Sequence, residues 1–250
     1  MRMEFKDHFS GHAELYRDAR PVPPADWFDW LAQQAPDRGL AWDAGCGNGQ
    51  ASVGLAAHFA RVVATDPSAA QIAQAAAHPR IDYRVEPAEH STLAAGSASL
   101  IGVSQAYHWF DRAAFHAEVR RVAKPGALVA ISAYGNCSVS RAVDAVERHL
   151  YTDTLGPDWP PERALVDAGY AGLPFPYQRV DAPSFMLRAD WNLAQFLAYL
   201  RSWSATQRHA KRTGVDAVAN AAPELAVAWG DPDRKRAVRW PFFVRVGRVE

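Results

Sequence analysis

Four residues early in the chain have the types and spacing of a ligand-binding loop. Asp43 ends a short apolar run, and Gly45, Gly47 and Gly49 follow at alternate positions before a segment typical of a helix start. A strand, a glycine turn and a helix N-terminus bring backbone amides into contact with a ligand. The spacing differs from the G-x-G-x-x-G of dinucleotide-binding proteins, and the Asp43 carboxylate would repel a pyrophosphate. The loop therefore predicts a ligand that carries an ammonium group.

A second carboxylate follows a second, β-branched run. Asp66 lies 23 positions after Asp43. In a nucleotide-binding βαβ unit, an acid at this separation accepts hydrogen bonds from ribose hydroxyls. Asp66 can also be the N-cap of the alanine-rich helix expected after Pro67, and one position can serve both roles. The two carboxylates together favour nucleoside binding.

These residues must be positioned by short apolar segments that alternate with helix-like segments. Such alternation builds a parallel sheet with helices on both faces. Asp111 is expected to cap the helix before the fifth segment, and Lys124-Pro125-Gly126 to end that helix. About a hundred residues then precede a last apolar run at 240–247, more than one crossover needs. Helix-like runs at 141–151, 193–203 and 215–229 predict a helical cap inserted there. The five apolar segments cover residues 40–44, 61–65, 81–85, 99–104 and 127–133.

At these motifs the chain resembles the class I S-adenosylmethionine-dependent methyltransferases over residues 38–135. The segment S-Q-A-Y-H-W-F-D at 104–111, with residues 16–21 and 200–205, is further similar to the trans-aconitate methyltransferase group. The resemblance implies an α/β fold: a Rossmann-like, doubly wound, mostly parallel sheet with an antiparallel last strand between strands five and six. We expect one methyltransferase domain over 1–250. Its parts are an N-terminal helical lid (1–37), a cofactor-binding core (38–135), a helical cap with strand six (136–235) and the last strand (236–250).

The resemblance also implies S-adenosyl-L-methionine as the cofactor. Asp43 would lie near the methionine ammonium, the glycine loop against the amino-acid part, and Asp66 at the ribose. Ala88 and Glu89 would hold the adenine; Pro87 stands where many members carry an aspartate, and Glu89 is either its substitute or solvated. The residues implied in cofactor binding are Tyr16, Arg20, Asp43, Gly45, Cys46, Gly47, Asn48, Gly49, Asp66, Pro67, Ala88, Glu89, Ser104 and Gln105.

Arginines provide candidate contacts to anionic groups. Arg20 can clamp the cofactor carboxylate or an anionic substrate through paired hydrogen bonds, with Tyr16 on the same helical face. The alternative is a surface helix end before Pro21. On the cap, Arg201 and Trp203 are either a substrate-facing pair or a charged rim beside a buried indole; we favour burial for Trp203.

Tyr107, His108 and Trp109 are the candidate catalytic residues, in a positioning role. The aromatic rings can offset the cost of burying a sulfonium, or can pack in the core under the cap. His108 is a candidate general base. A carboxylate acceptor needs no deprotonation near neutral pH, so we favour a hydrogen-bonding role that shapes the loop.

The composition excludes several classes of protein. Lys and Arg together number 27, as do Asp and Glu, so there is no basic surplus to bind nucleic acid. Two cysteines suit a reducing compartment, and we expect Cys46 to be structural. The histidines show no ligand-like pairing, so no metal is predicted. Because no secretion signal or membrane span is evident, we expect a cytoplasmic protein that acts on a small molecule; the sequence leaves its oligomeric state open.

The expected activity is in-line transfer of a methyl group to a small molecule, at a carboxylate or hydroxyl oxygen. Methylation of nucleic-acid bases is disfavoured, because residues 104–107 lack the Asn/Asp-Pro-Pro-aromatic turn which that reaction usually needs. The alternative from another class is a non-catalytic, S-adenosylmethionine-binding module that regulates a partner. Turnover with a small-molecule panel separates the two.

Overall fold

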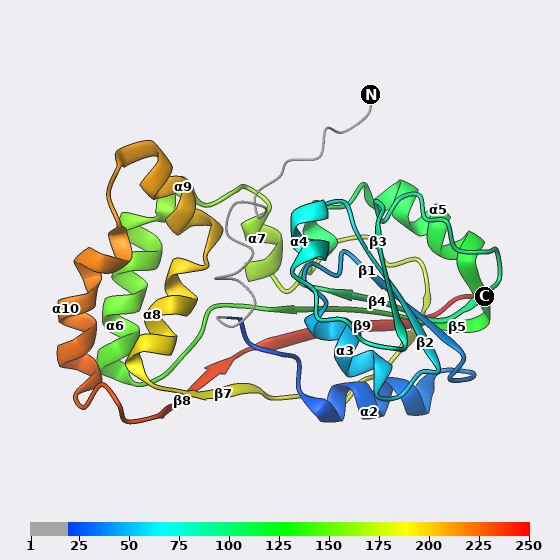
Figure 1. The fold of residues 1–250 in the computed structure, drawn as a ribbon, viewed down its shortest axis with the longest axis horizontal. Helices are drawn as coiled ribbons and strands as arrows, with labels where there is room; N and C mark the ends of the chain where they lie inside the picture. Colours follow the sequence, from blue (N-terminus) through cyan, green and yellow to red (C-terminus); the bar gives the residue numbers. More distant parts are fainter. Residues whose placement is uncertain (1–19) are drawn as a thin grey trace.

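The computed structural model describes residues 20–250. Within that range the chain forms a seven-stranded sheet in the order β3-β2-β1-β4-β5-β9-β6 (Figure 1). Strands β1 to β5 are parallel, and β9 runs antiparallel between β5 and β6. The expected Rossmann-like fold with an antiparallel last strand is therefore confirmed. The strands are β1 (Leu40–Ala44), β2 (Arg61–Asp66), β3 (Ile81–Val85), β4 (Ala98–Ser104), β5 (Ala123–Tyr134), β6 (Gln178–Val180) and β9 (Phe242–Arg248).

Helices cover both faces of this sheet. Neighbouring residues of the central strands belong to different core clusters: Trp42 and Ile101 lie in one, Ala41 and Leu100 in the other. Side chains along a strand alternate between its faces, so continuous apolar runs are needed where both faces are covered. Figure 1 shows α2 and α3 on one side of the sheet and α5 on the other. The helices that pack around the sheet are α2 (Ala25–Gln34), α3 (Gln50–Ala56), α4 (Ala69–Ala73), α5 (Arg112–Val122) and α7 (Arg163–Asp167).

Helix α5 forms as its sequence predicts. The Asp111 side chain accepts hydrogen bonds from two backbone amides of the first turn, at 3.1 and 3.2 Å. Phe115, Val119 and Val122, which recur at helical spacing, are fully buried against the sheet. The cap satisfies amides that have no partner inside the helix. The apolar stripe fixes which face of the helix is turned inward.

Two strand boundaries differ from expectation. β5 begins at Ala123, not at 127, because the Lys-Pro-Gly turn lies inside the strand as an irregularity in its pairing with β4, and Gly126 has a φ of +73°. The late run at 240–247 is two strands. Pro241 separates them, since proline has no N–H to donate to a ladder. β8 (Arg236–Trp240) pairs with β7 (Leu187–Trp191), whereas β9 pairs with β5.

The cap is a group of helices beside the end of the sheet (Figure 1). Its core is rich in indoles, with Trp191, Trp203, Trp229 and Trp240 all buried. Helix α9 was not expected, because its polar sequence shows no apolar stripe. The cap therefore follows strand β5, as predicted, with one more helix than the sequence indicated. Its helices are α6 (Arg141–His149), α8 (Leu193–Arg201), α9 (Ser204–Thr213) and α10 (Ala217–Trp229).

The lid expected over residues 1–37 lies only partly within the described chain. Helix α2, which falls inside that range, packs on the sheet. The Trp27 ring meets Phe185 and Phe242 edge-on, with centroids 5.1 and 5.8 Å apart. α2 therefore belongs to the core layer, and a lid over residues 1–19 stays a prediction.

Candidate active site

A cavity of about 1200 Å³ lies at the carboxyl ends of the central parallel strands. Residues at or near the ends of β1, β2, β4 and β5 line it, namely Asp43, Asp66, Ser104 and Tyr134. The sheet is wound outward in both directions from β1 and β4. Open α/β sheets bind their ligands at such a switch point, outside the carboxyl ends of the strands.

The glycine loop between β1 and α3 borders this cavity. All three glycines have positive φ angles, of +69°, +55° and +83° along the chain. A Cβ on Gly45 would lie 2.6 Å from that of Ala106, and one on Gly49 would clash with the Tyr83 ring. A Cβ on Gly47 would meet only the Gln71 side chain, at 3.8 Å. Gly45 and Gly49 are therefore required by packing, while Gly47 leaves open the space that a ligand can use.

Asp43 is a buried carboxylate at the foot of the loop. The Ser52 hydroxyl donates a 2.5 Å hydrogen bond to its Oδ2, and Oδ1 is buried with no partner among residues 20–250. Burial raises the pKa of Asp43 to about 6; the Ser52 hydrogen bond opposes this and the charge of Asp66 adds to it. An unpartnered buried oxygen is costly, and a ligand ammonium would satisfy it.

Two other loop side chains, Asn48 and Cys46, line the cavity. Asn48 is buried, and its Nδ2 has no partner in the described part of the chain. This donor suits the carboxylate end of an amino-acid ligand. Burial raises the pKa of the Cys46 thiol well above its usual range, so the thiol is neutral. That state fits the structural role expected for Cys46.

Asp66 lies at the end of β2, where the sequence places it. Its carboxylate accepts hydrogen bonds from the backbone amides of Gly47 and Ser68, both at 2.9 Å. The expected N-cap role was wrong by two positions: Ser68 is the N-cap of α4, and its hydroxyl accepts from Gln71 N. Asp66 instead fixes the glycine loop while facing the cavity, and each of its oxygens can accept a further bond.

Residues after β2 and β3 border the same cavity. Pro67 follows β2, Ala88 and Glu89 follow β3, and all three line the cavity. The Glu89 Oε1 accepts a 2.9 Å hydrogen bond from the backbone amide of Asp111. Glu89 therefore joins the loop after β3 to the start of α5, a role that neither sequence alternative included.

Gln105 and Arg20 meet through Tyr134. Gln105 has a φ of +57°, and its side-chain amide is paired with the Tyr134 backbone, accepting from N–H at 2.8 Å and donating to C=O at 3.3 Å. The Arg20 guanidinium donates to the Tyr134 hydroxyl at 3.1 Å and to the Ser202 carbonyl at 2.7 Å. Arg20 is thus a cation on the cavity wall, not a surface helix end. Tyr16, its expected partner, lies outside the described residues.

The segment Tyr107 to Trp109 is a single 3-10 turn, and its side chains point into different environments. Tyr107 is fully buried, donates to the Pro174 carbonyl at 3.0 Å and bonds His116 at 2.9 Å, so its ring is in the core and not in the cavity wall. His108 and Trp109 line the cavity. The expected set of three catalytic candidates is therefore reduced to two.

His108 has the environment of a neutral imidazole. Its Nδ1 lies 2.8 Å from the Tyr170 hydroxyl. Burial, together with the nearby cation of Arg163, lowers the pKa of His108 to about 3. Such a ring is uncharged at neutral pH and is a poor proton acceptor there.

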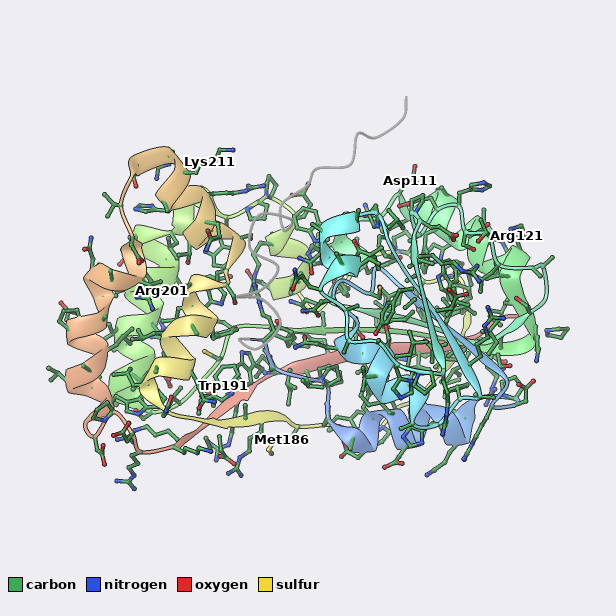
Figure 2. All side chains as sticks on the ribbon, viewed as in Figure 1. Asp111, Arg121, Met186, Trp191, Arg201 and Lys211 are labelled. Atoms are coloured by element: carbon green, nitrogen blue, oxygen red, sulfur yellow. The ribbon has the colours of Figure 1, made fainter. Side chains whose placement is uncertain are left out.

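The structure distinguishes the two alternatives for the cap residues. Trp203 is buried, as predicted, and Arg201 is partly exposed and pairs with Asp216 at 3.5 Å, so the pair is a charged rim beside a buried indole. Figure 2 shows Arg201 within the cap, and it does not contribute to the cavity wall. Of the candidate residues Arg20, Arg201 and Tyr107, only Arg20 lines the cavity.

Some residues of the site were missed by the sequence analysis. Tyr134 ends the fifth parallel strand, and that position alone could have indicated it. Glu162 and Leu165 line the cavity from the chain before and within α7. No motif marks them, because the phase of a helix as short as α7 is set by packing alone.

Two further properties concern the described residues. Within residues 20–250, no three His, Cys, Asp or Glu side chains are grouped so as to hold a metal ion. None of the helices in that range has the length and apolar character needed to cross a membrane.

Comparisons with known proteins agree with this fold. Residues 42–131 match the family model described as a methyltransferase domain. A solved structure named "Putative Type II Methyltransferase", from Anaeromyxobacter dehalogenans, is 49% identical, covers 92% of this chain and 97% of its own, and superposes with a TM-score of 0.85. A "putative methyltransferase" of Dictyostelium discoideum is 29% identical over 99% of this chain and 97% of its own. The chain belongs to the class I S-adenosylmethionine-dependent methyltransferases.

Proposed function

We propose that this protein binds S-adenosylmethionine in the cavity and methylates a small molecule at an oxygen atom. The observation that carries the proposal is Oδ1 of Asp43, a buried carboxylate oxygen with no partner among residues 20–250, beside the open space at Gly47. A zwitterionic amino-acid group fits both features, since its ammonium would satisfy the oxygen and its chain would fill the space.

The cavity wall offers a contact for each part of the cofactor. Asp43 and Asn48 would hold the amino-acid end, Asp66 the ribose hydroxyls, and the loop at Ala88 the adenine. When bound, the cofactor supplies an electrophilic methyl group on a sulfonium. The protein's part is to hold an acceptor oxygen in line with it, which is worth about 7–11 kcal/mol in favourable models.

The size of the cavity supports a small acceptor. Its volume of about 1200 Å³ is slightly above the roughly 300–1,000 Å³ of ordinary small-molecule sites. That space suits a cofactor together with one small acceptor. His108 and Trp109 line the cavity on the side of β4, and Arg20 and Tyr134 on the side of β5.

The lining favours an oxygen that is already deprotonated. A carboxylate is ionised at neutral pH, and Arg20 provides a cation to attract it. The similarity of residues 104–111 to the trans-aconitate methyltransferase group supports the same acceptor class. Hydroxyl acceptors remain the second candidate within this activity.

The test is binding followed by turnover. Calorimetry with S-adenosylhomocysteine should show binding to the purified full chain. Methyl transfer from labelled S-adenosylmethionine should then be measured with a panel of small carboxylic acids, phenols and amines. Binding without turnover of any member would favour the non-catalytic regulatory module, and absence of binding would contradict the proposal as a whole.

A further inference from the structure

Tyr170 has an unusual backbone conformation for a large aromatic residue. It follows α7 with a φ of +60°, and its side chain is fully buried. Bulky residues rarely adopt this left-handed region, because the conformation is sterically strained. Contacts hold it in place: its amide donates to the Leu165 carbonyl at 2.8 Å, and its carbonyl accepts from Arg245 at 3.0 Å. The backbone therefore fixes where the Tyr170 hydroxyl lies.

That hydroxyl determines the tautomer of His108. The Tyr170 hydroxyl lies 2.8 Å from Nδ1 of His108, and no other acceptor for its proton is found among the described residues. If Nδ1 carried a proton and donated, the buried hydroxyl proton would be left without an acceptor, which is costly. The favoured arrangement has Tyr170 donating to Nδ1, so that Nε2 carries the ring proton.

Burial raises the pKa of Tyr170, so its hydroxyl keeps the proton that it donates to Nδ1. The charged group that acts on the imidazole is Arg163 on α7, and its cation disfavours a second ring proton.

The Nε2–H group is left for a ligand. His108 lines the cavity, and its Nε2 has no hydrogen-bond partner within residues 20–250. We infer that Tyr170 holds His108 as a fixed Nε2–H donor that binds the carboxylate of the acceptor, so that the substrate is a carboxylic acid. The inference rests on the proposed function and selects one of its two acceptor classes. His108 would contact the substrate, and Tyr170 would be a positioning residue.

The chemistry balances without a base. One carboxylate oxygen accepts from Nε2–H while the carboxylate forms a bond to the methyl carbon. The methyl–sulfur bond breaks and its electron pair stays on sulfur, so a carboxylate and a sulfonium become an ester and a thioether. No proton moves. A hydroxyl acceptor, by contrast, would need a base to take its proton. This imidazole cannot be that base, because Nε2 already carries a proton.

Nitrogen-15 NMR of the histidine side chains tests the tautomer directly. In the full chain, with and without S-adenosylhomocysteine, His108 should show a protonated Nε2 and an unprotonated Nδ1 from pH 5 to 9. The His108→Gln spectrum assigns the signal. Tyr170→Phe keeps the ring but removes the donor, and should give a mixture of tautomers. A protonated Nδ1, or titration of His108 near neutrality, would overturn the inference.

Turnover tests the acceptor class, with benzoate and trans-aconitate as probes against benzyl alcohol and aniline. The pH profile of kcat/KM for methylation of an acid should show no titration of a histidine near neutrality. Tyr170→Phe should lower kcat/KM by about tenfold. Because an amide N–H can replace Nε2–H, His108→Gln should retain more activity than His108→Ala. Methylation of the alcohol or amine but of neither acid would overturn the acceptor class. Unchanged binding of S-adenosylhomocysteine in these variants would show that cofactor binding stands independently of the outcome.

Discussion

The Ser52 hydroxyl bonds one oxygen of Asp43, and the other oxygen of that carboxylate is buried without a partner in the described chain. Ser52 lies on α3, which begins directly after the glycine loop, so the loop and the helix together fix the carboxylate at the end of β1. Burial raises the pKa of Asp43 to about 6. The ligand-free protein therefore maintains an unfavourable buried charge at neutral pH, which a ligand cation would compensate.

Affinity for S-adenosylhomocysteine should depend on pH through Asp43. The ammonium group of S-adenosylhomocysteine prefers the ionised carboxylate of Asp43. Calorimetry should therefore give an affinity about tenfold weaker at pH 5 than at pH 7.5. The pKa is raised in the folded protein, so stability of the ligand-free protein should fall as pH rises from about 4 to 6. Asp43→Asn should remove both dependences and weaken binding at pH 7.5. Equal affinity of the wild-type protein at the two pH values would contradict the assignment.

Asp66→Ala should weaken binding of S-adenosylhomocysteine by about 1–3 kcal/mol, because charge-assisted hydrogen bonds to the ribose are lost. The Asp66 carboxylate also accepts a hydrogen bond from the Gly47 backbone amide. Asp66→Asn is the matched control, since its amide oxygen can still accept from that amide. An intermediate affinity for Asp66→Asn would separate loop support from ribose binding. Wild-type affinity for Asp66→Ala would show that the carboxylate does not contact the ligand.

Gly47→Val should abolish cofactor binding and leave the protein folded. The new side chain would enter the open space at the loop, and the positive φ adds about 1–3 kcal/mol of strain. Gly45→Val is the contrasting variant: its side chain would collide with Ala106 and Phe110 inside the protein, so it should lower the melting temperature much further. If a folded Gly47→Val protein bound the cofactor normally, the loop would be only a turn.

The cofactor side of the site was predictable because it is local. Asp43, the glycines and Asp66 belong to one strand–turn–helix–strand unit, in which backbone geometry fixes where side chains lie. The parallel strands were predictable for the same reason, as continuous apolar runs between helices. The ends of strands and helices were harder to predict. The N-cap of α4 is Ser68 and not Asp66, because either residue type can cap a helix.

The acceptor side was not predictable, because contacts far apart in sequence decide it. Residues 107–109 are equally aromatic, and a single 3-10 turn determines that Tyr107 points into the core while His108 faces the cavity. The state of His108 depends on Tyr170, 62 positions later, in a segment without a motif. The alternatives for Arg201 stayed open because an arginine at a helix end gives no sign of whether its side chain faces a ligand or solvent.

The two arginines therefore give the last prediction, as a matched pair. Arg201→Ala should leave kcat and KM nearly unchanged, because the side chain is partly exposed, lies outside the cavity wall, and forms only a surface ion pair with Asp216. Arg20→Ala should raise KM for a carboxylate acceptor, or weaken cofactor binding, by about tenfold or more through loss of a cation on the cavity wall. Calorimetry with S-adenosylhomocysteine decides which ligand Arg20 holds. Weakened binding would assign Arg20 to the cofactor carboxylate, and normal binding with a raised KM would assign it to the acceptor. A larger effect from Arg201→Ala than from Arg20→Ala would mean that the acceptor approaches through the cap and not along the wall at Tyr134.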